Sequence, residues 1–396
     1  MNIEKLQDYQ CSGCCACANA CPRNAITMRE NMEGFIYPVI DHALCIECSA
    51  CDRACTQVHE CLQEEDMLNR DSVPQAYAVI NDNPLTRDKS SSGGVFRLLA
   101  EKVIHQGGIV YGASFNEKWE VCHGSVDNSI DLEKLQGSKY VQSRIGLVYR
   151  DIKKQLATGR LVLFSGTPCQ CEGLYGYLGI KYDNLFVVDL ICHGVPSPLV
   201  WKHYIQYVCK LKKSTEISRI SFRSKNLSWE RYLLEFTFVN SSKYQNDLHT
   251  DIYMRGFLQD LYLRKSCYRC TCRKLHRISD ITLADFWGIK DVLPSMYDGK
   301  GTSLVLVQSQ KGEKMLSGIV AQKERVDFAQ GIRGNPAYLV SPALNPKRDM
   351  FFQYLHDGKD FVLIMKKCLR EPIYKRIRDR LRSVRILRTV YHCMRK

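Results

Sequence analysis

The sequence predicts an α+β protein in three parts: a small cysteine-rich head, a larger mixed α/β domain and a basic C-terminal helix. Two cysteine runs of identical spacing lie within the first 62 residues, and short apolar strands alternate with amphipathic helices from residue 74 onward. Basic residues are concentrated after residue 366. The chain has 396 residues, of which 45% are hydrophobic and 25% charged, a composition that supports a packed core. We therefore expect domains at 1–62, 74–345 and 366–396.

The head contains two C-x2-C-x2-C-x3-C runs, the first followed by Pro22 and the second by Thr56. Runs of this kind hold two [4Fe–4S] clusters in bacterial ferredoxins, where the fourth cysteine of each run binds the cluster of the other run. Short steps of three residues wrap a loop around a cube and direct three thiolates inward. The spacing therefore predicts a ferredoxin-like head with two clusters, one held by Cys11, Cys14, Cys17 and Cys55, the other by Cys45, Cys48, Cys51 and Cys21.

The alternative for the head is zinc, which needs four ligands and usually binds paired C-x2-C knuckles. Two complete four-cysteine runs favour iron–sulfur clusters instead. The whole chain contains 20 cysteines, and its first residues show no apolar signal-peptide core, so we expect a cytoplasmic protein. In a reducing cytosol many cysteines indicate metal or redox chemistry rather than disulfides.

The second domain is expected to begin after a polar linker at 62–73. Three serines and two glycines at 90–94 precede a helix expected at 95–105. Hydroxyls and glycines at a helix N-terminus suit a phosphate, although the same residues also form an ordinary N-cap. Strands are expected at 109–115, 161–164 and 185–191, with a helix at 147–158. A strand–helix–strand order in the later part predicts two parallel neighbours.

Cys169 and Cys192 follow these two strands, at the carboxyl edge where open parallel sheets bind ligands. A knuckle at Cys267 and Cys270 supplies two further thiolates, so the four cysteines predict a third [4Fe–4S] cluster. The alternative is that the first two are small buried residues and that the knuckle is inert. Cys171 and Cys272 each lie two residues beyond a proposed ligand, where a register error would exchange them.

Six segments, taken in order, resemble the family of coenzyme F(420), or deazaflavin, hydrogenase/dehydrogenase β-subunits. They are SGG at 92–94, GSKYVQS at 137–143, FSGTPCQ at 164–170, DLICHGVPS at 189–197, CYRC at 267–270 and SDITLADFWG at 279–288. The resemblance supports Cys169, Cys192, Cys267 and Cys270 as cluster ligands. It also implies a flavin, FAD, in a non-Rossmann site formed by Ser92, Gly93, Gly94, Lys139, Ser165, Gly166 and Thr167. Ala284 departs from the family, which more often has glycine there.

Together these features predict an iron–sulfur flavoprotein oxidoreductase with no identified catalytic residue. Clusters carry single electrons and a flavin exchanges a hydride, so the expected route joins an external ferredoxin or reductase to the head clusters, the third cluster, the flavin and a substrate or deazaflavin-like coenzyme. One alternative is a non-catalytic electron-transfer subunit that serves a partner enzyme. Another is an iron–sulfur nucleic-acid binder, which the charge distribution of the chain does not favour.

Residues 366–396 contain 12 Lys and Arg against 2 Asp and Glu, a net charge of +10. The rest of the chain has a net charge of only +4, so we expect no nucleic-acid partner. Apolar residues recur in steps of three or four from Leu369 to Tyr391, which predicts a basic amphipathic helix suited to an anionic membrane surface or a partner protein. On the membrane interpretation the protein lies at the inner face of the membrane. The alternative is a terminal helix that packs on its own domain.

Overall fold

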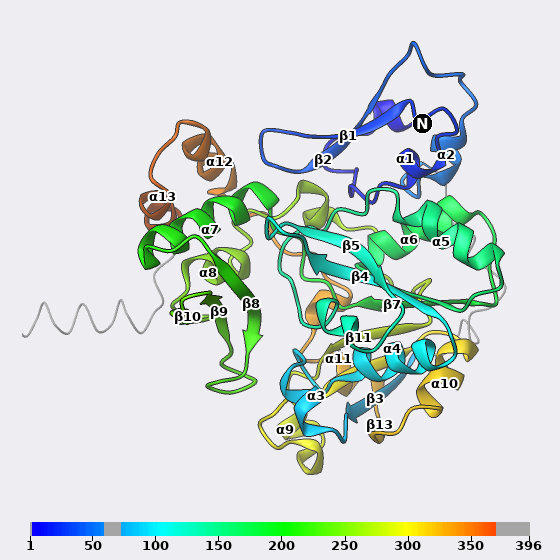
Figure 1. The fold of residues 1–396 in the computed structure, drawn as a ribbon, viewed down its shortest axis with the longest axis vertical. Coiled ribbons are helices and arrows are strands. Elements are labelled where there is room, and N and C mark those ends of the chain that lie inside the picture. The colour runs from blue at the N-terminus through cyan, green and yellow to red at the C-terminus, as the bar shows by residue number, and fades with distance from the viewer. Residues whose placement is uncertain (1, 59–72, 370–396) are drawn as a thin grey trace, which may run out of the picture.

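The computed structural model describes residues 2–58 and 73–369 (Figure 1). Its N-terminal head is built from two short helices and a two-stranded antiparallel sheet. Helices α1 and α2 occupy the same place in the two cysteine runs, because each begins after a residue with left-handed backbone, Cys15 or Ser49, and each ends at the fourth cysteine of its run. The elements of the head are α1 (Ala16–Ala20), β1 (Ile26–Glu30), β2 (Ile36–Ile40) and α2 (Ala50–Ala54).

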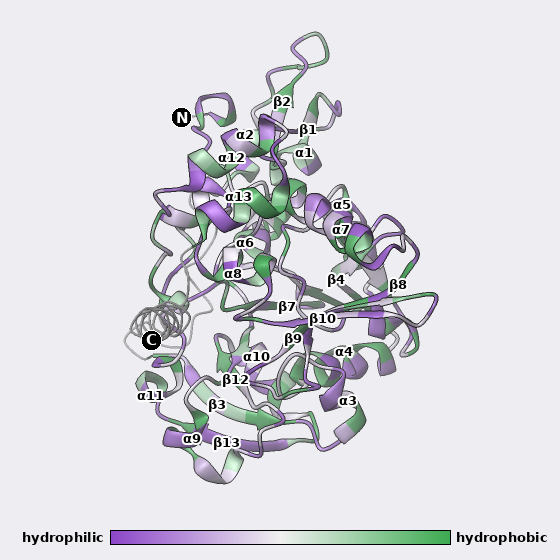
Figure 2. Cartoon of the chain, turned by 90° about the vertical axis from the view of Figure 1, so that its left-hand side faces the viewer, coloured by the Kyte–Doolittle hydropathy of each residue, from purple (hydrophilic) through white to green (hydrophobic). Residues whose placement is uncertain are grey.

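The body is organised around an eight-stranded sheet in the order β13-β3-β12-β11-β7-β6-β4-β5. Strands β4, β6, β7 and β11 are parallel, and antiparallel strands complete both edges. Strand β7, green and therefore hydrophobic in Figure 2, runs through the middle of the molecule. The strands are β3 (Gln75–Ile80), β4 (Ile109–Phe115), β5 (Val121–Val126), β6 (Val162–Ser165), β7 (Leu185–Leu190), β11 (Ile281–Asp285), β12 (Ser303–Val307) and β13 (Gln322–Val326).

Helices cover both faces of this sheet, because successive strand residues point to opposite sides. Phe186 and Val188 of β7 pack with α4 (Val95–His105) and α10 (Gln310–Ser317) on one face. Leu185 and Val187 pack with α5 (Val148–Ala157) and α6 (Pro168–Leu178) on the other. Shorter helices complete the periphery: α3 (Pro84–Asp88), α9 (Ile289–Val292) and α11 (Phe328–Ile332).

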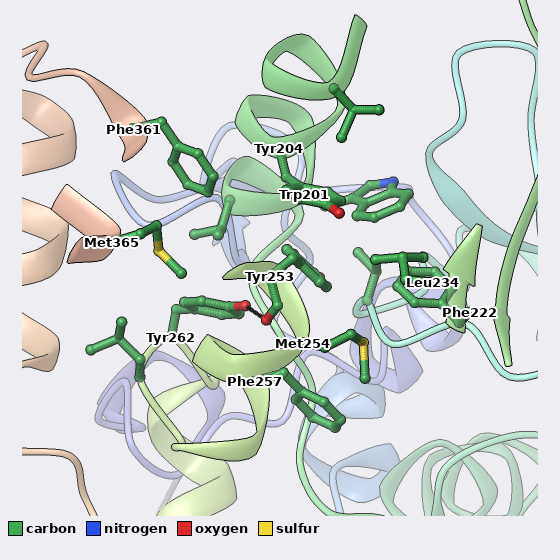
Figure 3. Packing of buried hydrophobic residues seen from close by; sticks show 14 of the residues in the cluster. Trp201, Tyr204, Phe222, Leu234, Tyr253, Met254, Phe257, Tyr262, Phe361 and Met365 are labelled. Atoms are coloured by element: carbon green, nitrogen blue, oxygen red, sulfur yellow. Dashed lines mark hydrogen bonds between the residues drawn. The ribbon is translucent and has the colours of Figure 1, made fainter. Parts of the chain in front are cut away.

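A second, aromatic core lies beside the main sheet (Figure 3). Trp201 and Tyr204 of α7 face Tyr253 of α8, and the Tyr262 hydroxyl donates a hydrogen bond to the Tyr253 carbonyl. The surrounding elements are α7 (Pro198–Lys212), β8 (Ile217–Ser224), β9 (Leu233–Phe238), β10 (Lys243–Asp247), α8 (Ile252–Leu258), α12 (Arg348–His356) and α13 (Phe361–Cys368). The three strands form a separate antiparallel sheet.

The elements expected from the sequence are confirmed with small shifts at their ends. The helix at 95–105 and the strand at 109–115 are present as expected, and β6 and β7 are parallel neighbours, with Val162 beside Leu185. After residue 345, α12 and α13 contribute to the same aromatic core as α7 and α8.

The head shares a core with the body. Cys15, Ala16 and Ala54 belong to the same buried cluster as the apolar faces of α5 and α6. Two glycines allow α6 to lie directly against the head. A Cβ at Gly173 would lie 2.8 Å from the Cys14 Sγ, and one at Gly176 would lie 2.4 Å from the Ala54 carbonyl oxygen. The head therefore packs on the helix that also carries Cys169 in its first turn.

Arg348 joins the head to α12 through a buried ion pair with Glu33. Its side chain is 1% exposed, and its Nη1 lies 2.7 Å from Glu33 Oε1. Arg348→Ala is expected to lower the free energy of unfolding by about 3–5 kcal/mol, because it leaves a carboxylate without its partner at a dry interface. Anaerobic urea unfolding tests this, with the exposed Arg219→Ala as a control expected to change stability by no more than about 0.5 kcal/mol. An Arg348→Ala protein as stable as the control would contradict the prediction.

Two segments expected from the sequence lie largely outside the described residues. This applies to the linker up to residue 72 and to the basic tail beyond residue 369. Residues 366–368 end α13, with Lys366 and Lys367 exposed and Cys368 buried. Within the described chain, no helix combines the length and the apolar character needed to cross a bilayer.

Candidate iron–sulfur and flavin sites

Four cysteines from three segments of the body line one pocket. Cys169 lies in the first turn of α6, Cys192 lies just beyond β7, and Cys267 and Cys270 come from the segment that follows α8. Parallel strands β6 and β7 bring the first two together because both end at the same edge of the sheet. The loop before β11 brings the other two over this edge. The structure thus gathers the four cysteines that the sequence proposed as a cluster site.

Three of the four half-buried thiols in this pocket have raised pKa values. Burial raises the pKa of Cys169 well above its usual value, and the neighbouring Cys270, Cys192 and Cys267 raise it further. Burial likewise raises the pKa of Cys192 to about 11 and that of Cys267 to about 12. The pKa of Cys270 is instead lowered to about 6, because the Cys272 thiol donates a hydrogen bond to it. The three thiols with raised pKa values favour the protonated form, and bound iron would stabilise all four as thiolates.

Hydrogen bonds from the surrounding chain meet two of the sulfurs. The Val195 N–H lies 3.4 Å from Cys267 Sγ, and the Thr167 hydroxyl lies 3.2 Å from Cys169 Sγ. Hydrogen bonds to thiolate ligands are one means by which a protein sets the reduction potential of a cluster.

Cys171 and Cys272, the two cysteines that a register error would exchange for proposed ligands, lie in different surroundings. Cys171 is fully buried in the core between α6 and the sheet, and it does not line the pocket. Cys272 does line the pocket, and its Sγ lies 3.2 Å from Glu172 Oε2. Cys171 therefore cannot replace Cys169 as a ligand in this pocket. Cys272 lies where it could replace Cys270.

The head contains a second cysteine-lined cavity. Cys11, Cys14 and Cys17 line it together with Cys55 from the other run, as the crossed ferredoxin pattern predicts. The other crossed set also has members that are neighbours, because the charge of Cys21 contributes to the raised pKa of Cys51, after burial and Asp52. Cys48 is exposed, so the second set reaches the surface of the head.

The two cavities share a wall. Ser12 and Gln57 line both of them, one from the first cysteine run and one from just after the second. The Gln57 amide also donates to the Thr271 hydroxyl, 3.0 Å away, beside Cys270. The first set of head cysteines is therefore the direct neighbour of the body pocket.

Within the described residues, no three His, Cys, Asp or Glu side chains are arranged to hold a single metal ion. In a [4Fe–4S] cluster each thiolate binds a different iron atom, so its four sulfurs are spread more widely than the ligands of one zinc ion.

Two of the segments proposed for the flavin are in contact. The Ser138 N–H donates to the Ser91 hydroxyl, 2.8 Å away, which places the Lys139 loop beside the serine–glycine turn. Among the described residues, the Lys139 ammonium donates to the carbonyls of Gln136 and Gly137, at 3.0 and 3.2 Å. Burial lowers its pKa to about 7. No carboxylate of the described chain pairs with it.

His123 is a member of this site that the sequence did not single out. Its Nε2 lies 3.0 Å from the Ser165 carbonyl, which can only accept, so Nε2 carries the proton and Nδ1 is an acceptor. This Nδ1 is buried without a protein partner among the described residues. Burial and, to a smaller extent, the nearby charge of Lys139 lower the pKa of His123 to about 4, so the ring is neutral at physiological pH. His123 lies on edge strand β5, and no sequence motif includes it, so the sequence did not indicate its place in the site.

The serine–glycine turn fits tightly against the sheet. A Cβ at Gly93 would lie 2.3 Å from the Val79 carbonyl, so only glycine fits there. The hydroxyls of Ser91 and Ser92 are occupied by Ser138 and by the Thr302 carbonyl, and the Gly93 N–H donates to Ser303. Within the part of the chain that the structure describes, no side chain caps the N-terminus of α4.

Arginines around the body pocket are a further feature that the sequence prediction did not use. Arg273 donates to the carbonyls of Cys192 and His193 at 2.9 and 3.1 Å, and Arg277 pairs with Asp189 at 2.9 Å. Arg264 is fully buried and donates to the carbonyls of Cys11 and Ile36 in the head. Four arginines lie within residues 264–277, around the CYRC knuckle. This concentration of arginines in the sequence could have indicated an anionic site.

A protein-family model that describes the C-terminal part of the beta subunits of coenzyme F420 hydrogenases and dehydrogenases matches residues 159–328. The matched segment holds all four cysteines of the body pocket and the Ser165–Thr167 turn. This segment of the chain is thus similar to the C-terminal part of the coenzyme F420 hydrogenase/dehydrogenase β-subunits. The resemblance seen in the motifs is thus confirmed. Ser92–Gly94 and Lys139 lie before the matched segment.

Two curated proteins are similar to the chain. One is a subunit of the F(420)H(2) dehydrogenase of Methanosarcina mazei, 26% identical over 179 residues, which are 43% of this chain and 49% of that protein. The chain thus matches about half the length of this relative. The other is an uncharacterized protein of Methanocaldococcus jannaschii, 23% identical over 360 residues, which are 81% of this chain and 90% of that protein.

Among solved structures, the chain is similar to a chain of the F420-reducing [NiFe] hydrogenase complex from Methanosarcina barkeri. The TM-score is 0.43 and the sequence identity is 14%. The similarity covers 76% of this chain and 96% of that one.

Proposed function

We propose that this protein is an iron–sulfur flavoprotein oxidoreductase that carries single electrons between its head and a flavin in its body. The flavin, when bound, exchanges a hydride with a substrate or a deazaflavin-like coenzyme. The observation that carries the proposal is the wall that Ser12 and Gln57 form between the two cysteine-lined cavities, because neighbouring clusters give electrons a continuous path.

The donor sets fit iron–sulfur clusters. Eight head cysteines in two crossed sets would hold two [4Fe–4S] clusters, and Cys169, Cys192, Cys267 and Cys270 would hold a third. Arg273 and Arg277 would offset the negative charge of that third site. The head would function as a ferredoxin-like module fused to the body, with an external ferredoxin or reductase as its partner.

The residues around Lys139 fit a flavin. Its ammonium would meet a phosphate or a flavin oxygen, and His123 Nδ1 would accept a hydrogen bond that the described protein itself does not supply. The uncapped start of α4 at Ser92–Gly94 and the Ser165–Thr167 turn would provide backbone groups. In this proposal these residues bind and orient FAD. None of them is assigned as an acid or base in the reaction.

A second candidate is an electron-transfer subunit whose partner holds the active site. It is favoured by the name of the first relative, which is one subunit of a dehydrogenase. Turnover by the isolated chain with a deazaflavin would exclude it. The basic tail at 366–396 is then proposed as the contact with that partner or with an anionic membrane surface, at the inner face of the membrane.

Anaerobic purification followed by metal and cofactor analysis tests the main proposal. We expect about 12 iron atoms per chain, from three clusters of four, and one FAD released by denaturation. Stoichiometric zinc instead of iron would end the cluster interpretation. A protein with full iron that takes up no flavin after reconstitution would leave only the electron-transfer interpretation.

A further inference from the structure

A basic cleft separates the head from the body on the side of the exposed cysteine set. Its volume is about 530 Å³, and it is lined by the start of α2, the end of α6 and one face of α5. Three of its lining residues are cationic, Arg53, Arg150 and Lys153, and no acidic residue of the described chain lines it.

The positive charge of this cleft is not neutralised within the described protein. Arg150 donates to the carbonyls of Asn19, Ala18 and Cys21 at 2.7–3.0 Å, and therefore joins the head to α5 through neutral acceptors. Arg53 donates to the Cys48 carbonyl at 3.1 Å, and Lys153 lies 5.5 Å from the ring centre of Tyr177. No described carboxylate forms an ion pair with any of the three, so each keeps an uncompensated charge.

The cleft lies beside the head cysteines that reach the surface. Cys21 lines it, Ala50 beside Cys51 lines it, and Arg53 holds the carbonyl of exposed Cys48. The other head set is covered by α6 and the body pocket. A protein docked in the cleft would therefore lie next to Cys21 and to the helix that carries Cys51.

We propose that the cleft is the docking site of an acidic one-electron carrier protein, whose carboxylates meet Arg53 and Lys153. This inference rests on the proposed electron-transfer function and specifies the partner by its charge. One electron leaves the reduced iron–sulfur centre of the carrier, which becomes oxidised, and reduces the group held by Cys21, Cys45, Cys48 and Cys51. No bond is made or broken, and no proton is transferred.

The test uses the full-length, iron-loaded protein and an acidic plant-type [2Fe–2S] ferredoxin as the probe. In stopped-flow experiments at low salt, an Arg53→Glu, Lys153→Glu protein is expected to be reduced by this ferredoxin at least about tenfold more slowly than wild type, with a flatter salt dependence. Lys153→Arg keeps the charge and should keep the rate. Lys202→Glu, on exposed α7 at the other side of the molecule, makes the same charge change elsewhere and should stay within about twofold of wild type (Figure 1).

A second donor and a binding assay separate the two proposals. Reduced methyl viologen is a small cation, so charge reversal should not slow its reaction. If it reduces no cluster in wild type, the electron-transfer function fails, and the docking site is then judged by binding alone. Carbodiimide couples lysines to carboxylates in contact, so Lys153 should appear in cross-linked peptides with ferredoxin. A double variant that reacts with and binds ferredoxin like wild type would overturn the docking site.

Discussion

A Cys267→Ala protein is expected to lose about four of its iron atoms and to stop transferring electrons from the head to the flavin. Clusters of this type need four cysteine thiolates, and Cys267 is one of four that meet in the body pocket. Its thiol also accepts the Val195 N–H, and alanine leaves the fold around it intact apart from that contact. Iron analysis and the electron paramagnetic resonance spectrum of the reduced protein measure the loss.

Two other cysteines serve as controls for this experiment. Cys209→Ala removes a half-buried thiol of α7 outside the pocket, and it should retain all the iron. Cys272→Ala removes the remaining thiol of the pocket, and the proposal expects iron to be retained there as well. If Cys272→Ala loses the iron while Cys270→Ala keeps it, the fourth ligand is Cys272 and the assignment from the motif is wrong. Unchanged iron in Cys267→Ala would reject the third cluster.

The sequence predicted β4, β6 and β7 of the central sheet because local patterns carried the information. The helix at 95–105 has an apolar stripe and a glycine-rich start, and the strands before Cys169 and Cys192 are short apolar runs ended by turn residues. Two such strands joined by one helix can pair only in parallel with a short connection. The convergence of the two cysteines followed from that topology.

The contact between the head and the body was not predictable from local patterns. Gly173 and Gly176 lie in an ordinary helix, and nothing in the sequence indicates that Cys14 and Ala54 press against them. The same applies to Arg348, whose partner Glu33 lies 315 residues away. His123 was missed for a related reason, since its function in the site depends on a buried Nδ1 that only the packing of β5 against Phe164 creates.

Lys139→Met is expected to weaken flavin retention about tenfold or more while making the flavin-free protein more stable. A hydrogen bond from a charged group contributes about 1.5–3 kcal/mol, and its loss should appear in the dissociation constant measured by fluorescence titration. Without the flavin, the buried ammonium has only two carbonyls to satisfy it, and its charge disfavours folding. A lysine with a purely structural role would instead destabilise the protein when removed.

The direction in which stability changes with pH provides a second test of the Lys139 prediction. The pKa of Lys139 is about 7 in the folded protein, well below the usual lysine value, so the unfolded chain binds more protons at any pH between the two. Stability of the flavin-free protein should therefore rise with pH across that window, and the full cost of the charge should be present below pH 7. Lys139→Met should lose this rise, whereas the exposed Lys118→Met should retain it. A Lys139→Met protein that is less stable than wild type at pH 6.5 and still binds FAD normally would remove Lys139 from the site.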